Sequence, residues 1–207
     1  MTEKIKTILE KFRQWEWTRY KKRKCSRIKN KEFTIIASNC GGTFIYYDMG
    51  LRYLTPTVNL SMGMDDFVKF AGNLKWYLEQ EFIELKEESR YPIGQLGDIK
   101  IYFVHYGTFE EGVAKWEERK KRIRWDNLFI MGTDKDGCTY ETIRKFDNLP
   151  YKNKVIFTHV RYPEFSSACY IKGFEDREEL GVITSFKKQF LKRRYLDDFN
   201  YVKFLNT

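Results

Sequence analysis

The stretch FTIIASNCGG at residues 33–42 decides the fold class, because an apolar run ends there in a cysteine and two glycines. The run FTIIA (33–37) has the length and the β-branched content of a buried strand, and a Gly-Gly pair suits the sharp turn that opens a helix. Cys40 lies at this turn. It is either a small residue packed where the chain changes direction or a reactive thiol beside the positive end of a helix.

Similar units follow along the chain. We expect further strands at 99–106, 127–131 and 154–160, and helices at 42–52, 64–88, 108–121 and 139–147. Helix caps are expected at Asp65 or Asp66, at Thr108 with Glu111, and at Thr139 with Thr142. Because strands that alternate with helices favour parallel crossovers, the pattern predicts an α/β fold, a three-layer α/β/α arrangement with a mostly parallel sheet.

Both ends of the chain are basic and amphipathic. Residues 2–20 place Ile5, Ile8, Leu9 and Phe12 at helical spacing, and 184–195 read as a basic helix with Phe186, Phe190 and Leu191 on its apolar side. We therefore divide the chain into an N-terminal basic helix (1–31), an α/β core domain (32–180) and a C-terminal basic helix and tail (181–207).

Composition limits the class of protein. With 207 residues, 42% of them hydrophobic and 17% aromatic, the chain can bury a full core, which excludes a disordered polypeptide. Its apolar runs fall short of the roughly 18 residues that span a bilayer, and its N-terminus lacks the apolar segment of a signal peptide, so we expect a cytoplasmic protein. Four cysteines, none in a CxxC pair, indicate free thiols: Cys25, Cys40, Cys138 and Cys169.

The formal net charge of +9 is unevenly distributed, with much of the excess at 19–31 and 187–194. Basic runs beside aromatic residues suit the phosphates of a nucleotide donor or an anionic membrane surface, which would place the protein peripherally at the inner face of the membrane. A solvated face explains the same runs equally well. Nucleic acid is the least expected partner, because no recognition motif accompanies the basic residues.

Chemically useful side chains cluster where the predicted strands end. Cys40 follows the first strand, His105 and His159 close two others, and Asp134 and Asp136 follow a fourth. Ligands of open parallel sheets bind beyond the carboxyl ends of the strands. We therefore predict that these five residues converge on one cleft.

The acidic pair lies in the segment GTDKDG (132–137). Two carboxylates one residue apart can hold a divalent cation, Mg²⁺ or Mn²⁺, on the diphosphate of a donor, although Asp and Gly also suit a plain turn. Residues assigned to donor binding are those of the first turn and of a basic run before the third strand: Asn39, Gly41, Gly42, Arg119, Lys121 and Arg124.

Five segments in order resemble the bacterial DUF1919 family: SNCGGTFIYYDMGLRYLTPTVNL, DDFVKFAGNLKWYL, YPIGQLGDIKIYFVHYGTFEEGVAKWEERKKRIRWDNLFIM, DKDGCT and FDNLPYKNKVIFTHVRYP. The resemblance covers about residues 33–175. Members of that family are often labelled exopolysaccharide or capsule biosynthesis proteins. The resemblance implies an α/β protein of surface-glycan assembly and assigns no catalytic residues.

Two transferase chemistries fit these residues, and the pattern favours the glycosyltransferase. In it, Asp134 and Asp136 hold a metal on a nucleotide sugar, and His105 or His159 deprotonates a lipid-linked glycan acceptor.

The alternative enzyme is an acyltransferase. In it, Cys40 attacks an acyl donor, a histidine oriented by Asp136 acts as base, and the Gly41 and Gly42 amides hold the oxyanion. A third hypothesis is a non-catalytic partner of the polysaccharide assembly machinery, which docks through its basic, aromatic ends.

Overall fold

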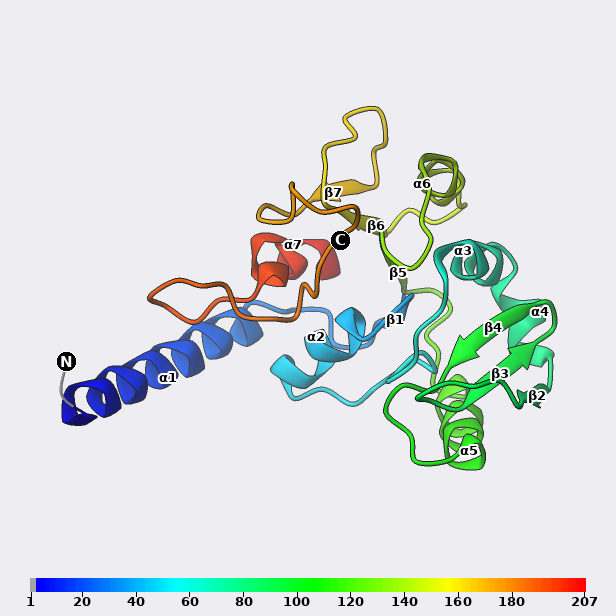
Figure 1. Ribbon diagram of the computed structural model, residues 1–207, viewed down its shortest axis with the longest axis horizontal. Helices are drawn as coiled ribbons and strands as arrows, with labels where there is room; N and C mark the ends of the chain where they lie inside the picture. The colour runs from blue at the N-terminus through cyan, green and yellow to red at the C-terminus, as the bar shows by residue number, and fades with distance from the viewer. Residues whose placement is uncertain (1–2) are drawn as a thin grey trace.

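A computed structural model describes residues 3–207 of the chain (Figure 1). Its helices are α1 (Glu3–Ser26), α2 (Gly41–Met49), α3 (Met64–Gly72), α4 (Leu74–Glu79), α5 (Phe109–Lys120), α6 (Tyr140–Asp147), the 3₁₀ helix η1 (Tyr195–Asp198) and α7 (Tyr201–Leu205). Its strands are β1 (Thr34–Ala37), β2 (Phe82–Leu85), β3 (Ile93–Leu96), β4 (Ile99–Tyr102), β5 (Leu128–Thr133), β6 (Lys154–Thr158) and β7 (Ala168–Tyr170).

The central sheet has the order β1-β5-β6-β7, and all of its neighbouring strands are parallel. Successive strand residues point to opposite sides of the sheet, and helices cover the side chains on both faces. Ile36 joins the cluster formed with α3, α4 and α6, whereas Ile35 joins the cluster formed with α2, η1 and α7. The predicted α/β fold, with helical layers on both faces of a mostly parallel sheet, is confirmed.

The first strand, turn and helix form as the sequence predicts. Gly42 lets α2 pack directly on β1, because a Cβ atom there would lie 2.8 Å from Cγ2 of Ile35 and 3.1 Å from Cβ of Ala37. The helix ends at Gly50, whose φ of 62° is left-handed. Gly42, predicted to bind a donor, thus has a packing role and does not line the cleft described below.

The prediction of one long helix at 64–88 is wrong. The chain breaks at Asn73 into α3 and α4, and then forms β2. The strand predicted at 99–106 is shorter, and it belongs to a separate antiparallel sheet of order β2-β3-β4. A two-residue turn at Gly97 and Asp98 joins β3 to β4, with a φ of 61° at Gly97. Glycine adopts this conformation without the steric penalty that a Cβ atom brings.

Helix caps follow the predictions in two of three places. Thr108 accepts a hydrogen bond from the Glu111 amide (3.2 Å), and Thr139 forms a capping box with Thr142. The third prediction is wrong, because Gly63 caps α3. The two aspartates of its first turn bond elsewhere, Asp65 to the Thr142 hydroxyl (2.6 Å) and Asp66 to the Lys100 amide (3.0 Å).

The prediction of a C-terminal basic helix at 184–195 is also wrong. These residues form an irregular strap, 186–194, with an isolated bridge between Phe186 and Arg194, and the strap runs along α1 (Figure 1). Its cations pair with acidic residues of α1 and α2: Lys192 with Glu10 (2.5 Å), Arg193 with Glu16 (2.7 Å) and Arg194 with Asp48 (2.5 Å). These ion pairs hold the strap in an irregular conformation, although its apolar residues have helical spacing. Within residues 3–207, no helix is both long and apolar enough to cross a membrane.

Candidate functional site

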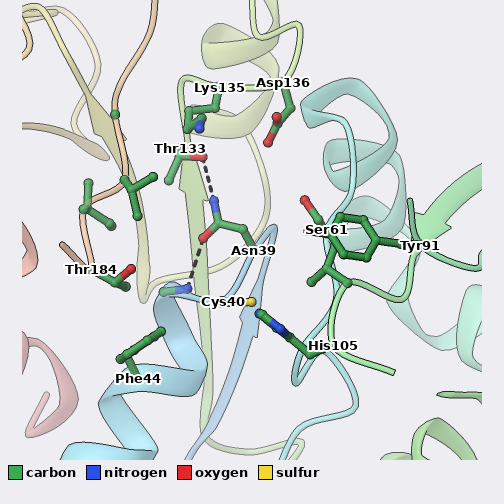
Figure 2. Close-up of a pocket in the computed structure, with 15 residues that line it drawn as sticks. Asn39, Cys40, Phe44, Ser61, Tyr91, His105, Thr133, Lys135, Asp136 and Thr184 are labelled. Carbon is green, nitrogen blue, oxygen red and sulfur yellow. Dashed lines mark hydrogen bonds between the residues drawn. The ribbon is translucent and has the colours of Figure 1, made fainter. Parts of the chain in front are cut away.

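A cleft of about 510 Å³ opens at the carboxyl edge of the parallel sheet (Figure 2). Its walls come from the ends of β1 and β5, the first turn of α2, the loop after β4 and the segment 181–184. It is lined by Asn39, Cys40, Gly41, Phe44, Ser61, Tyr91, Val104, His105, Thr133, Lys135, Asp136, Gly181, Val182, Ile183 and Thr184.

Asn39 fixes the floor of the cleft. Its Oδ1 accepts a hydrogen bond from the Gly41 amide (3.1 Å), and its Nδ2 donates to Oγ1 of Thr133 at the end of β5 (3.0 Å). Figure 2 shows both bonds. The two strand ends are thereby joined, and Cys40 is held at the N-terminus of α2, where its own side chain forms no capping bond.

The short segment 59–62 explains how His105, which follows a strand of the other sheet, reaches Cys40. Ser61 exchanges two backbone hydrogen bonds with Tyr102 at the end of β4 (3.0 and 2.8 Å), and the Met62 amide donates to the Ser38 carbonyl at the end of β1 (3.0 Å). This segment therefore brings the loop after β4 against the end of β1.

His105 and Cys40 face each other in the cleft. Figure 2 shows the imidazole directed at the Cys40 sulfur. His105 is exposed, whereas Cys40 is half-buried, and burial raises the pKa of its thiol above the ordinary cysteine value. The thiol is thus protonated near neutral pH, and a base must remove its proton before it can act as a nucleophile.

The loop that carries His105 is held from behind by Tyr106. The Tyr106 hydroxyl donates to the Val58 carbonyl (3.0 Å) and accepts from Nη1 of Arg119 (2.5 Å). Arg119, predicted to bind donor phosphates, therefore supports the His105 loop and does not line the cleft.

Asp134, which is buried, and His159, which is half-buried, form a pair at the ends of β5 and β6. The Asp134 carboxylate is bonded to the backbone amide of His159 (2.8 Å), to its Nδ1 (2.5 Å) and to the amide of Leu180 (3.0 Å). Both carboxylate oxygens are occupied, and the pair ties the ends of β5 and β6 to the loop at 180. Neither residue lines the cleft, so three of the five predicted residues, Cys40, His105 and Asp136, meet there.

Asp136 belongs to the cleft. Its φ of 55° is left-handed, and this backbone conformation lets the chain turn back toward α3, where its carbonyl accepts from the Met64 amide (3.2 Å). Partial burial of the carboxyl raises its pKa, an effect opposed by the charge of Lys135. The Asp134 carboxylate is engaged by His159 and Leu180, whereas Asp136 lines the cleft, and binding of a divalent cation by the two carboxylates stays a prediction. Within residues 3–207, no group of three or more His, Cys, Asp or Glu side chains is arranged to hold a metal ion.

The other predicted cations lie elsewhere. Lys121 follows the last turn of α5, and Arg124 lies before β5, toward the amino ends of the strands. The Arg124 guanidinium pairs with Glu32 (2.7 Å), and its amide donates to Oγ1 of Thr34 (2.8 Å). Lys135 does line the cleft, and the sequence analysis assigned it no role although it stands between the two aspartates.

Comparison with known proteins assigns the family. The model of the family described as "Domain of unknown function (DUF1919)" matches residues 11–206. The chain belongs to the DUF1919 family. The match extends beyond the motifs at 33–175 into both terminal segments of this DUF1919 protein. A protein of Haemophilus influenzae strain Rd, described as uncharacterized, is 42% identical over 204 residues, which are 99% of this chain and 97% of the relative.

Proposed function

We propose that this DUF1919 protein is a transferase of bacterial surface-polysaccharide biosynthesis, in which Cys40 acts as nucleophile and His105 as base to move an acyl group from an activated donor onto a glycan hydroxyl. The observation that carries the proposal is the thiol and the imidazole facing each other in one cleft, at the N-terminus of α2.

The chemistry needs two steps. In the first, the Cys40 sulfur attacks the acyl carbonyl of a thioester donor while His105 takes the thiol proton. The carbon–sulfur bond of an acyl-enzyme forms, and the donor thiol leaves with the proton from His105. In the second, His105 takes the proton of a glycan hydroxyl, whose oxygen attacks the acyl-enzyme, and the proton returns to the departing Cys40 sulfur.

The environment of Cys40 makes a base necessary for activating the thiol. Burial raises the pKa of Cys40, so the resting thiol is neutral and needs the adjacent base. The positive end of α2 stabilises negative charge on the sulfur or on the carbonyl oxygen. The sequence predicts the Gly41 amide as an oxyanion donor. In the structure this N–H already donates to Oδ1 of Asn39, so it is not free for that role.

Glycosyl transfer from a nucleotide sugar remains the second candidate, because Lys135, Asp136 and His105 line the same cleft. Lys135 would contact the donor phosphates, and His105 would deprotonate the acceptor. We rank this chemistry second because Asp134 is committed to His159 and Leu180, and because Lys121 and Arg124 lie away from the cleft. A cytoplasmic site acting on a lipid-linked acceptor is part of either proposal.

Incubation with acetyl-CoA and with UDP-glucose plus Mn²⁺ separates the two chemistries. Acyl transfer requires an acetylated Cys40 peptide and CoA release, both abolished in Cys40→Ser and retained in Cys169→Ser, a matched control on β7. Glycosyl transfer requires stabilisation by UDP-glucose that falls in Asp136→Asn and persists in Cys40→Ser. Failure of both donors would favour the non-catalytic partner.

A further inference from the structure

One stripe of α1 remains largely exposed within residues 3–207. It begins with four large apolar side chains spaced three or four residues apart, which places them on one face of the helix. Their exposed fractions are 48% for Ile5, 66% for Ile8, 45% for Phe12 and 53% for Trp15. Phe190 of the strap, 60% exposed, lies beside Phe12 with ring centroids 6.4 Å apart and widens the apolar area.

The same stripe continues as cations. Arg19, Lys22 and Arg23 follow Trp15 at the same helical spacing, and all three are exposed. Within residues 3–207 their side chains form no ion pair, whereas the guanidinium of Arg19 lies 4.6 Å from the centre of the Trp15 ring. The helix therefore presents an apolar half and a basic half along one line, 5–23.

The opposite side of α1 is already occupied. Trp17 is buried, Lys24 pairs with Asp197 (2.7 Å), and Glu10 pairs with Lys192 of the strap (2.5 Å). Contacts with the strap fix the orientation of α1 about its own axis. The stripe at 5–23 therefore faces away from the buried and ion-paired side of the helix. Figure 1 shows the first turns of α1 projecting from the body of the molecule, where a large surface can reach them.

We propose that this stripe docks on an anionic bilayer surface, with the apolar half entering the boundary between headgroups and acyl chains and the basic half lying on lipid phosphates. A helix parallel to the membrane plane presents both halves to the same depth of the bilayer, as interfacial helices do. A second copy of this chain fits less well, because packing stripe on stripe would bury the cations against apolar side chains or against each other. The proposal does not depend on the chemistry of the cleft.

Sedimentation with vesicles tests the proposal on the full chain. We expect binding to phosphatidylcholine vesicles that contain phosphatidylglycerol, weak binding to phosphatidylcholine alone, and loss of binding as salt rises. Arg19→Glu with Arg23→Glu, and separately Phe12→Ser with Trp15→Ser, should each weaken binding at least about tenfold. The control is Ile83→Ser with Arg90→Glu, which replaces one exposed apolar residue and one exposed cation outside the stripe, and it should bind as the unchanged protein does.

Circular dichroism of every variant verifies that the fold is kept. The proposal is overturned by absence of binding to the anionic vesicles, by equal binding to neutral vesicles, or by unchanged binding of the charge-reversal variant. It is also overturned if light scattering finds that Phe12→Ser with Trp15→Ser converts a dimer to a monomer, or if the charge reversal abolishes binding to RNA and leaves vesicle binding intact. The dimer-to-monomer conversion would identify a second copy as the occupant of the stripe, and the loss of RNA binding would identify nucleic acid.

Discussion

Substituting asparagine for Asp134 should lower the free energy of unfolding by about 2 to 4 kcal/mol, although the two side chains have nearly the same shape. Three N–H groups are bonded to this carboxylate, two from His159 and one from Leu180. A hydrogen bond to a charged group contributes about 1.5 to 3 kcal/mol. The remaining oxygen of asparagine can still accept from Leu180, but its NH₂ group would face the backbone N–H of His159, which cannot reverse its polarity. One bond is lost outright, and the bond to the imidazole is weakened.

Urea denaturation, with linear extrapolation to water, measures this loss. The matched control is Asp136→Asn, which makes the same charge change two residues later. The Asp136 carboxyl faces the cleft and makes no side-chain hydrogen bond within residues 3–207, so the control should stay within about 0.5 kcal/mol of the unchanged protein. An Asp134→Asn protein as stable as the control would refute the role of Asp134 as the tie between β5, β6 and the loop at 180.

Two further expectations concern packing and pH. Gly42→Ala should destabilise the protein by about 1 to 3 kcal/mol in the same urea assay, because the new Cβ would lie 2.8 Å from Ile35. Equal stability of the two proteins would contradict this direct packing of α2 on β1. The strap should loosen in acid, because hydrogen bonds from Lys192 and Arg193 lower the pKa values of Glu10 and Glu16. Carboxyls with lowered pKa stabilise the contact above their unfolded-state pKa, and this stabilisation is lost as pH falls through the folded-state values. Near-UV circular dichroism of the tryptophans should report the loosening as a transition that is missing in Glu10→Gln with Glu16→Gln, and an identical transition in that variant would exclude these pairs as its cause.

Much of the parallel sheet was predictable because its signals are local. Apolar runs at 33–37, 127–131 and 154–160 correspond to β1, β5 and β6, and the threonine caps of α5 and α6 mark where those helices begin. The hairpin of β3 and β4 also had a local signal, the Gly97–Asp98 pair between apolar residues, but the reading of 99–106 as a parallel strand overrode it.

The C-terminal strap could not be read from local pattern. Its apolar and basic residues have helical spacing, yet the contacts that order it come from residues about 150 to 180 positions earlier, such as Glu16 and Asp48. Ion pairs between distant segments leave no periodic signature in the sequence.

The candidate site was predictable in part, because the ends of the parallel strands have local signals in the sequence. Cys40 and Asp136 were found because residues after parallel strands meet at one sheet edge. His105 reaches the cleft by another route, through the pairing of Ser61 with Tyr102, which no sequence pattern indicated. Asp134 follows its strand as expected, but its side chain turns inward to His159, and only the three-dimensional contacts distinguish it from Asp136.

The most direct test of the proposed chemistry is the mass of peptides from the protein after brief exposure to acetyl-CoA and acid quenching. We expect one acetyl group on the peptide that contains Cys40, greatly reduced in His105→Ala and absent in Cys40→Ser, while Cys169→Ser is labelled as the unchanged protein is. An unlabelled Cys40 peptide across acyl donors, or transferase activity that persists in Cys40→Ser, would contradict the assignment of Cys40 as the nucleophile.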